Sequence, residues 1–205
     1  MNAGFLSLWL LSIFAILMTT GWKEIVAEGR LRVIGGWAVL CLLAQPVAFS
    51  VFGVPVSASA CCLLAAAIAG MRQADDRLQT GLLLTESGLI ALIWYGIRAC
   101  YASDPVFVFL DPRWDAPIAA GVLAAAFTFR PASQFGLVAF SALTAESLPF
   151  ILHERAAGAA PGSWAWWDAF WISFASARGC SVLYMLIRSA AANPLAHVFR
   201  RKKQS

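Results

Sequence analysis

Apolar residues occur along the chain in long runs that short charged segments separate. The runs approach about 20 residues, the length that an α-helix needs to cross a bilayer. We therefore expect an all-α, polytopic transmembrane helix bundle in which a tight turn at 53–55 joins the second and third spans. The seven predicted spans are residues 3–22, 33–52, 54–71, 81–97, 116–130, 134–152 and 164–187, and a basic tail follows at 188–205.

The segment 98–115 interrupts this pattern. A helix that began near residue 106 would carry Asp111, Arg113 and Asp115 into the membrane, where a charged residue costs about 2.5–3.5 kcal/mol at the bilayer centre. We therefore predict that 98–115 is an interfacial loop outside the membrane. The fifth span should begin near Ala116, with Asp115 as its helix cap.

Basic residues are distributed unequally between the two predicted sides. If the N-terminus is outside, the cytoplasmic segments hold eleven Lys and Arg residues and the outer segments hold three. Such an excess in cytoplasmic segments sets orientation, so we expect the N-terminus outside and the C-terminus in the cytoplasm. Five tryptophans fall at the predicted outer interface, where indole rings concentrate: Trp94, Trp114, Trp164, Trp166 and Trp167.

Composition agrees with a membrane protein and excludes several activities. The chain is 60% hydrophobic and only 13% charged, whereas soluble domains carry about 25% charged residues. The two histidines, His153 and His197, lie outside the predicted spans, which argues against intramembrane haem ligation and a Ser–His dyad. The five cysteines show no C-x-x-C spacing. We therefore predict no catalytic residues, cofactor or metal, and no nucleic-acid partner.

Ionisable residues inside spans are the candidate functional residues, because charges in a membrane are costly and face the bundle interior or water. Asp168 lies about one turn from the outer boundary, where we expect a solvated side chain. Glu146 and Arg178 have similar predicted depths on consecutive helices, so we expect them to form an ion pair. With Glu86, nearer the inner side, they form the candidate intramembrane polar site. Structural pairing and a functional role both remain open for these residues.

Partner surfaces are suggested by small residues and by the tail. Small residues at four-residue spacing allow close helix packing, within the chain or between copies: Ala65 with Ala69, Gly121 with Ala125, and Ala175 with Gly179. A tail helix that starts at Asn193 and Pro194 would place its basic cluster against anionic lipid headgroups.

The chain reads as a multi-pass membrane protein without a recognisable catalytic or cofactor motif, and the sequence does not specify its molecular function. One hypothesis is a small carrier of a solute or ion, with Glu86, Glu146 and Arg178 along a polar path, and the second is an interaction or assembly protein. An intramembrane enzyme ranks third, because no nucleophile–base pair supports it. The second class would dock a membrane partner or a second copy of the chain. We expect no enzymatic activity in either case.

The sequence G-F-L-S-L-W-L-L-S at 4–12, followed by T-G-W-K at 20–23, resembles the start of YphA-type membrane proteins of spore-forming bacteria. The chain length and the seven-span layout are also similar. This resemblance implies a bacterial plasma membrane protein and carries no functional motif.

Overall fold

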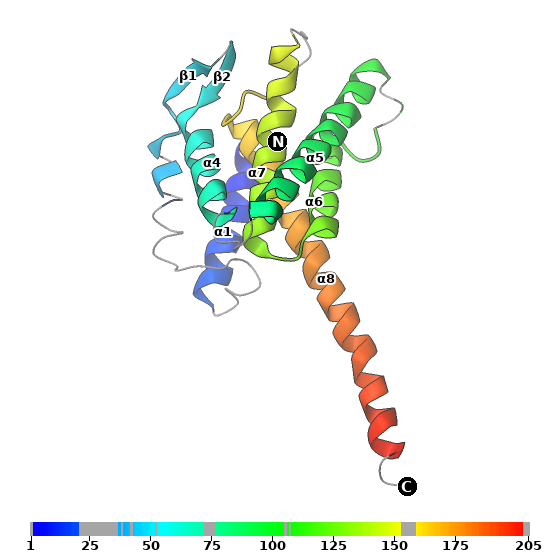
Figure 1. Ribbon diagram of the computed structural model, residues 1–205. Coiled ribbons are helices and arrows are strands. Elements are labelled where there is room, and N and C mark those ends of the chain that lie inside the picture. Colours follow the sequence, from blue (N-terminus) through cyan, green and yellow to red (C-terminus); the bar gives the residue numbers. More distant parts are fainter. Residues whose placement is uncertain are drawn as a thin grey trace.

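The computed structural model describes residues 2–20, 37, 39–41, 43–51, 53–71, 77–104, 106, 108–152 and 159–202. It is mostly helical, and its last helix runs well past the other helices (Figure 1). The elements are α1 Phe5–Thr19, β1 Ala48–Val51, β2 Val54–Ser57, α4 Ala58–Met71, α5 Arg77–Ser103, α6 Asp115–Phe127, α7 Pro131–Ile151 and α8 Trp164–Lys202.

Three of the described helices are long and apolar enough to cross a membrane, within α5, α7 and α8. Helix α7 has 21 residues and is therefore about 31 Å long, close to the thickness of the hydrocarbon core. Helices α1, α4 and α6 are apolar but have only 15, 14 and 13 residues. The structure thus supports a helical membrane protein, whereas the seven full spans predicted from sequence are not confirmed.

A β-hairpin lies where the sequence predicts the junction of the second and third spans. Strands β1 and β2 pair antiparallel, with Ala48 opposite Ser57 and Val51 opposite Val54. Gly53 between them has a φ of 81°, a conformation that glycine adopts without steric cost. The predicted turn is confirmed, and the described chain is mostly helical, but residues 48–51 and 54–57 form strands where the sequence predicts helices. In the earlier part of that span, residues 33–36, 38 and 42 lie outside the described residues.

Two helices extend beyond their predicted bounds. Helix α5 continues to Ser103, so Arg98 is helical, and the predicted loop at 98–115 begins only after Ser103. Helix α8 continues through Pro194 to Lys202, and the predicted helix start at Asn193 is wrong. The residues between Ile187 and Asn193 include three consecutive alanines, which are strong helix formers and give the helix no reason to end.

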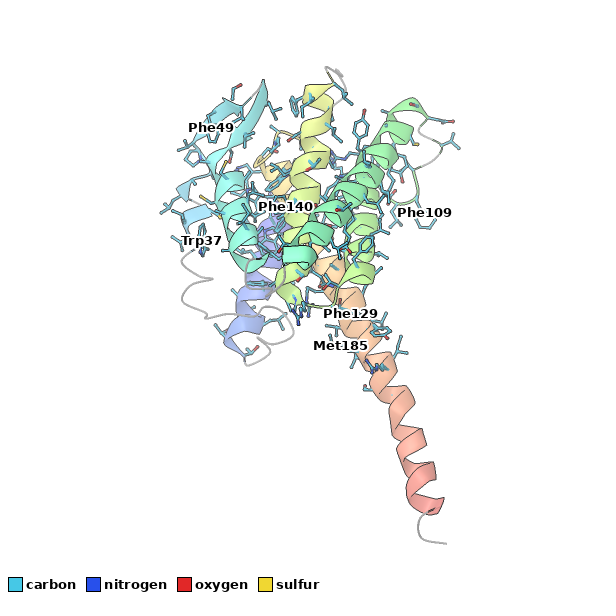
Figure 2. The ribbon with its side chains drawn as sticks, in the orientation of Figure 1. Trp37, Phe49, Phe109, Phe129, Phe140 and Met185 are labelled. Atoms are coloured by element: carbon cyan, nitrogen blue, oxygen red, sulfur yellow. The ribbon has the colours of Figure 1, made fainter. Side chains whose placement is uncertain are left out.

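The core lies where α4, α5, α6, α7 and α8 meet, and side chains fill the space between these helices (Figure 2). Trp94, Leu137 and Phe170 are fully buried there. Gly121 allows α6 to approach α8 so closely that an added Cβ would lie 2.2 Å from the Ser173 carbonyl oxygen. The small-residue pair that contains Gly121 therefore serves packing within the chain.

Candidate functional site

A buried ion pair joins α5 and α7. The guanidinium of Arg98 contacts the carboxylate of Glu146, and the backbone N–H of Ala159 donates to Glu146 Oε2 at 2.9 Å. The Glu146 side chain is fully buried, whereas 25% of the Arg98 side chain is exposed. The carboxylate is thus enclosed by protein, and the guanidinium keeps a route to the surroundings.

Helix geometry explains why these two residues meet. Helices α5 and α7 pack against each other and run in the same direction, because α6, which follows α5 in the chain, runs the opposite way (Figure 1). Arg98 lies five residues before the end of α5 at Ser103, and Glu146 lies five residues before the end of α7 at Ile151. The two side chains therefore reach the same level of the bundle.

The loop that provides Ala159 is also bound to the hairpin. Pro161 accepts a hydrogen bond from the Ser57 N–H at 2.9 Å, and the Gly162 carbonyl accepts one from Gln45 Nε2 at 2.7 Å. Trp167 on α8 donates its indole N–H to Ser59 Oγ at 3.2 Å. Glu146 is thereby linked through one short loop to the hairpin and to the start of α4.

A second polar cluster lies at the opposite end of α7. Arg178 Nη1 donates to Gln134 Oε1 at 2.9 Å and to the Phe129 carbonyl at 3.2 Å. The Gln134 amide donates in turn to Ser181 Oγ at 2.6 Å and to the Thr128 carbonyl at 2.6 Å. The cluster joins α8 to the loop between α6 and α7.

The predicted pair between Glu146 and Arg178 is therefore wrong. Arg178 is level with Gln134, which is twelve residues before Glu146 on α7, or about 18 Å along the helix. The predicted depth of Arg178 was counted from residue 187, the predicted inner end of the seventh span. Helix α8 passes the loop between α6 and α7 before residue 187, so the count does not give the level of Arg178 in the bundle. The true partner, Arg98, was not predicted, because the apolar pattern places it in an outer loop. The apolar residues on both sides of Arg98 were the available signal that the helix continues.

Glu86 does not join either cluster. It is half-buried on α5, twelve residues before Arg98, which corresponds to about 18 Å along the helix. Within the part of the chain that the structure describes, it has no hydrogen-bond or ion-pair partner. The structure therefore does not bring Glu86, Glu146 and Arg178 into one site.

Asp168 is not the solvated side chain that the sequence predicts. Its carboxylate accepts hydrogen bonds from the N–H groups of Gly4 and Ser7, both at 2.7 Å, and from the Ser7 hydroxyl at 2.6 Å. The first N–H groups of a helix lack partners within the helix, and a carboxylate satisfies them well. Asp168 thus caps α1 from α8 and holds the start of α1 beside Trp164, whose ring lies against Gly4.

Asp115 also acts differently from the prediction. It begins α6 but makes no capping hydrogen bond to that helix. Its carboxylate accepts the Tyr101 hydroxyl at 3.0 Å and the N–H groups of Phe109, Leu110 and Asp111. The Asp115 carboxylate therefore binds the N–H groups of the loop that precedes α6, and it orders that loop instead of capping the helix.

One polar group without a partner lies next to Arg98 on α5. The buried indole N–H of Trp94, one turn before Arg98, has no hydrogen-bond acceptor among the described residues. Pro149 follows Glu146 by three residues inside α7 and removes one hydrogen bond of that helix. No group of His, Cys, Asp and Glu within the described ranges could hold a metal ion.

Comparison with known proteins identifies the family. A model of the YphA-like integral membrane proteins matches residues 3–205. Searches of curated proteins and of solved structures found no match. The family match agrees with the three apolar helices, places the protein in a lipid bilayer and confirms the resemblance seen at the start of the sequence. The chain therefore belongs to the family of YphA-like integral membrane proteins.

Proposed function

We propose that this protein is a small, non-enzymatic carrier of a polar solute or ion in the bacterial plasma membrane. Its outer-side polar site is the Arg98–Glu146 pair. The observation that carries the proposal is a fully buried carboxylate in a membrane bundle whose partner, Arg98, remains partly exposed. Ionisable residues inside membranes are costly to keep and commonly mark substrate or ion pathways.

Features around the pair support a site rather than a purely structural link. Trp94 lies one turn, or about 6 Å along α5, before Arg98, and its buried indole N–H has no hydrogen-bond partner among the described residues. Buried polar groups almost always have partners, so an orphan donor next to an ion pair is consistent with a bound polar ligand or water. The cluster of Arg178 and Gln134 provides polar groups at the other end of α7.

Seven crossings with the N-terminus outside remain part of this proposal. The start of α1 contacts the start of α8 through Asp168, and α8 ends at the opposite side of the bundle (Figure 1). A start of α1 and an end of α8 on opposite sides agree with an odd number of crossings. The eleven basic residues of the predicted cytoplasmic segments favour the same orientation, and the basic tail would then meet anionic lipids of the inner leaflet.

The test is transport by the purified full chain in vesicles. Charge movement on a solid-supported membrane should be recorded after concentration jumps of protons, Na⁺, K⁺, acetate, phosphate and a mixture of amino acids. We expect at least one jump to produce a current in wild-type vesicles. Arg98→Gln and Glu146→Gln should abolish it, because each breaks the ion pair.

Glu86→Gln is the matched control, since it neutralises a carboxylate on α5 that lies outside the pair. It should keep the wild-type current. The carrier proposal fails if wild-type and protein-free vesicles respond alike to every jump, and the assignment of the site fails if Arg98→Gln transports normally.

An interaction or assembly protein is the second candidate. Ala175 and Gly179 are exposed on one face of α8, and a Cβ added at Gly179 would meet nothing within 4 Å. Such a face can pack closely against a helix of another chain or a second copy. Ala175→Cys should then form a disulfide-linked dimer in membranes, while exposed Val122→Cys on α6 should not. Absence of any cross-link, together with no co-purifying protein in mild detergent, would exclude this candidate.

A further inference from the structure

The loop between α5 and α6 presents strongly exposed apolar side chains. Val106 and Phe109 are each 86% exposed, and Leu110 is 64% exposed. Figure 2 shows Phe109 at the side of the bundle, pointing away from the helices. Clustered apolar surface of this kind is unfavourable in water and marks a contact with a membrane or a partner.

The backbone of the same loop is satisfied internally. Every N–H from Phe109 to Asp115 has an acceptor within the loop or the first residue of α6, apart from Pro112, which has no N–H. The Asp115 carboxylate accepts from residues 109–111, the Asp111 carboxylate accepts from Arg113 at 2.8 Å, and the Asp111 carbonyl accepts from residues 114 and 115. A loop in water can leave N–H groups to the solvent, whereas a loop near lipid must satisfy them itself.

We propose that residues 106 and 108–114 insert into the interface of the leaflet on the Arg98 side, with Val106, Phe109 and Leu110 among the lipid acyl chains. Lipid is the occupant because the two helices that the loop connects, α5 and α6, also expose large apolar side chains, among them Leu92 and Val122. In an integral membrane protein these helix faces meet lipid.

The polar residues of the loop limit how deeply it enters. Asp111 and Arg113 keep this part near the headgroups, and Trp114, 37% exposed, is of the residue type that concentrates at membrane interfaces. Insertion by about 5–10 Å, as for interfacial helices, places the apolar side chains below the headgroups while the charges stay hydrated. The loop then acts as a lateral anchor that holds the end of α5 next to the Arg98–Glu146 pair.

Fluorescence quenching tests this placement. The full chain carries Phe109→Cys, and its five native cysteines are replaced. A nitrobenzoxadiazole label is attached to this cysteine, and the labelled protein is reconstituted into vesicles of phosphatidylcholine and phosphatidylglycerol. Nitroxide-bearing lipids should quench this label, and aqueous iodide should not. The control position is Ala102→Cys in the last turn of α5, which is exposed and should be quenched by iodide.

Two outcomes overturn the proposal. Equal iodide quenching at positions 109 and 102 would place the loop in water. Protection of position 109 from both quenchers would show that protein, a partner or a second copy, covers it. If the cysteine-free chain does not fold, the wild-type chain is reconstituted into vesicles that contain a diazirine-bearing phospholipid, and the lipid is photo-cross-linked to the protein. Cross-links should then map to 106–114, and cross-links that map to α5 at Leu92 but not to this loop would contradict insertion.

Discussion

Replacing Arg98 should destabilise the protein more than replacing Glu146. Arg98→Gln leaves a fully buried carboxylate whose remaining hydrogen bond comes from the Ala159 N–H at 2.9 Å. Breaking a buried ion pair in this way costs about 3–5 kcal/mol. Glu146→Gln removes the buried charge itself, and Gln can still accept from Ala159. The orphaned Arg98, which is 25% exposed, can turn toward polar surroundings, so we expect a loss of only about 1–3 kcal/mol.

The assay is a double-mutant cycle on unfolding free energy in detergent, with Arg98→Gln, Glu146→Gln and the double variant. The double variant should be more stable than Arg98→Gln alone, because no uncompensated buried charge remains. Additive losses, or a larger loss for Glu146→Gln than for Arg98→Gln, would refute the reasoning. A parallel cycle with Arg178→Gln and Glu146→Gln is the control and should be additive, because the two residues lie about 18 Å apart along the bundle.

Three further predictions follow from separate contacts. Gly121→Ala should lower the free energy of unfolding by about 1–3 kcal/mol, because the added methyl group overpacks against the Ser173 carbonyl. Gly88→Ala is the control, since a Cβ there meets nothing within 4 Å. It should leave the free energy of unfolding unchanged or raise it by up to about 1 kcal/mol in the same assay. Asp168→Ala should cost about 0.5–2 kcal/mol and expose the Gly4 and Ser7 amides to hydrogen exchange; unchanged exchange would show that Asp168 does not hold α1. For topology, a cysteine at position 158 should be labelled from outside the cell and one at position 75 only after permeabilisation, and reversed labelling would invert the orientation.

Helix positions followed well from the apolar pattern, but helix ends did not. The predicted spans at 134–152 and 164–187 begin within three residues of α7 and α8. A helix that faces lipid shows no periodic burial, so the length of its apolar run is the signal that predicts its position. The end of α5 was missed because a charge at Arg98 was assumed to end the span. A single charged residue can stay in a helix when a neighbouring helix supplies its partner, as Glu146 does.

The polar partners could not be predicted because they depend on the relative height of the helices. Glu146 and Asp168 were recognisable from sequence as ionisable residues in apolar segments, but their contacts with Arg98 and with the first turn of α1 join distant parts of the chain. The β-hairpin around Gly53 was hidden for a different reason: its valine-rich flanks have the same hydropathy as a membrane helix and favour strands only through β-branching.

The most direct test of the account is transport by the double variant Arg98→Gln with Glu146→Gln. If the pair is a transport site, this variant should fold with stability near wild type in detergent yet give no current in vesicles after the jump that wild type responds to. If the pair only links α5 to α7, the double variant should regain the wild-type current together with near wild-type stability. A folded double variant with the wild-type current would therefore contradict the assignment of Arg98 and Glu146 as the carrier site.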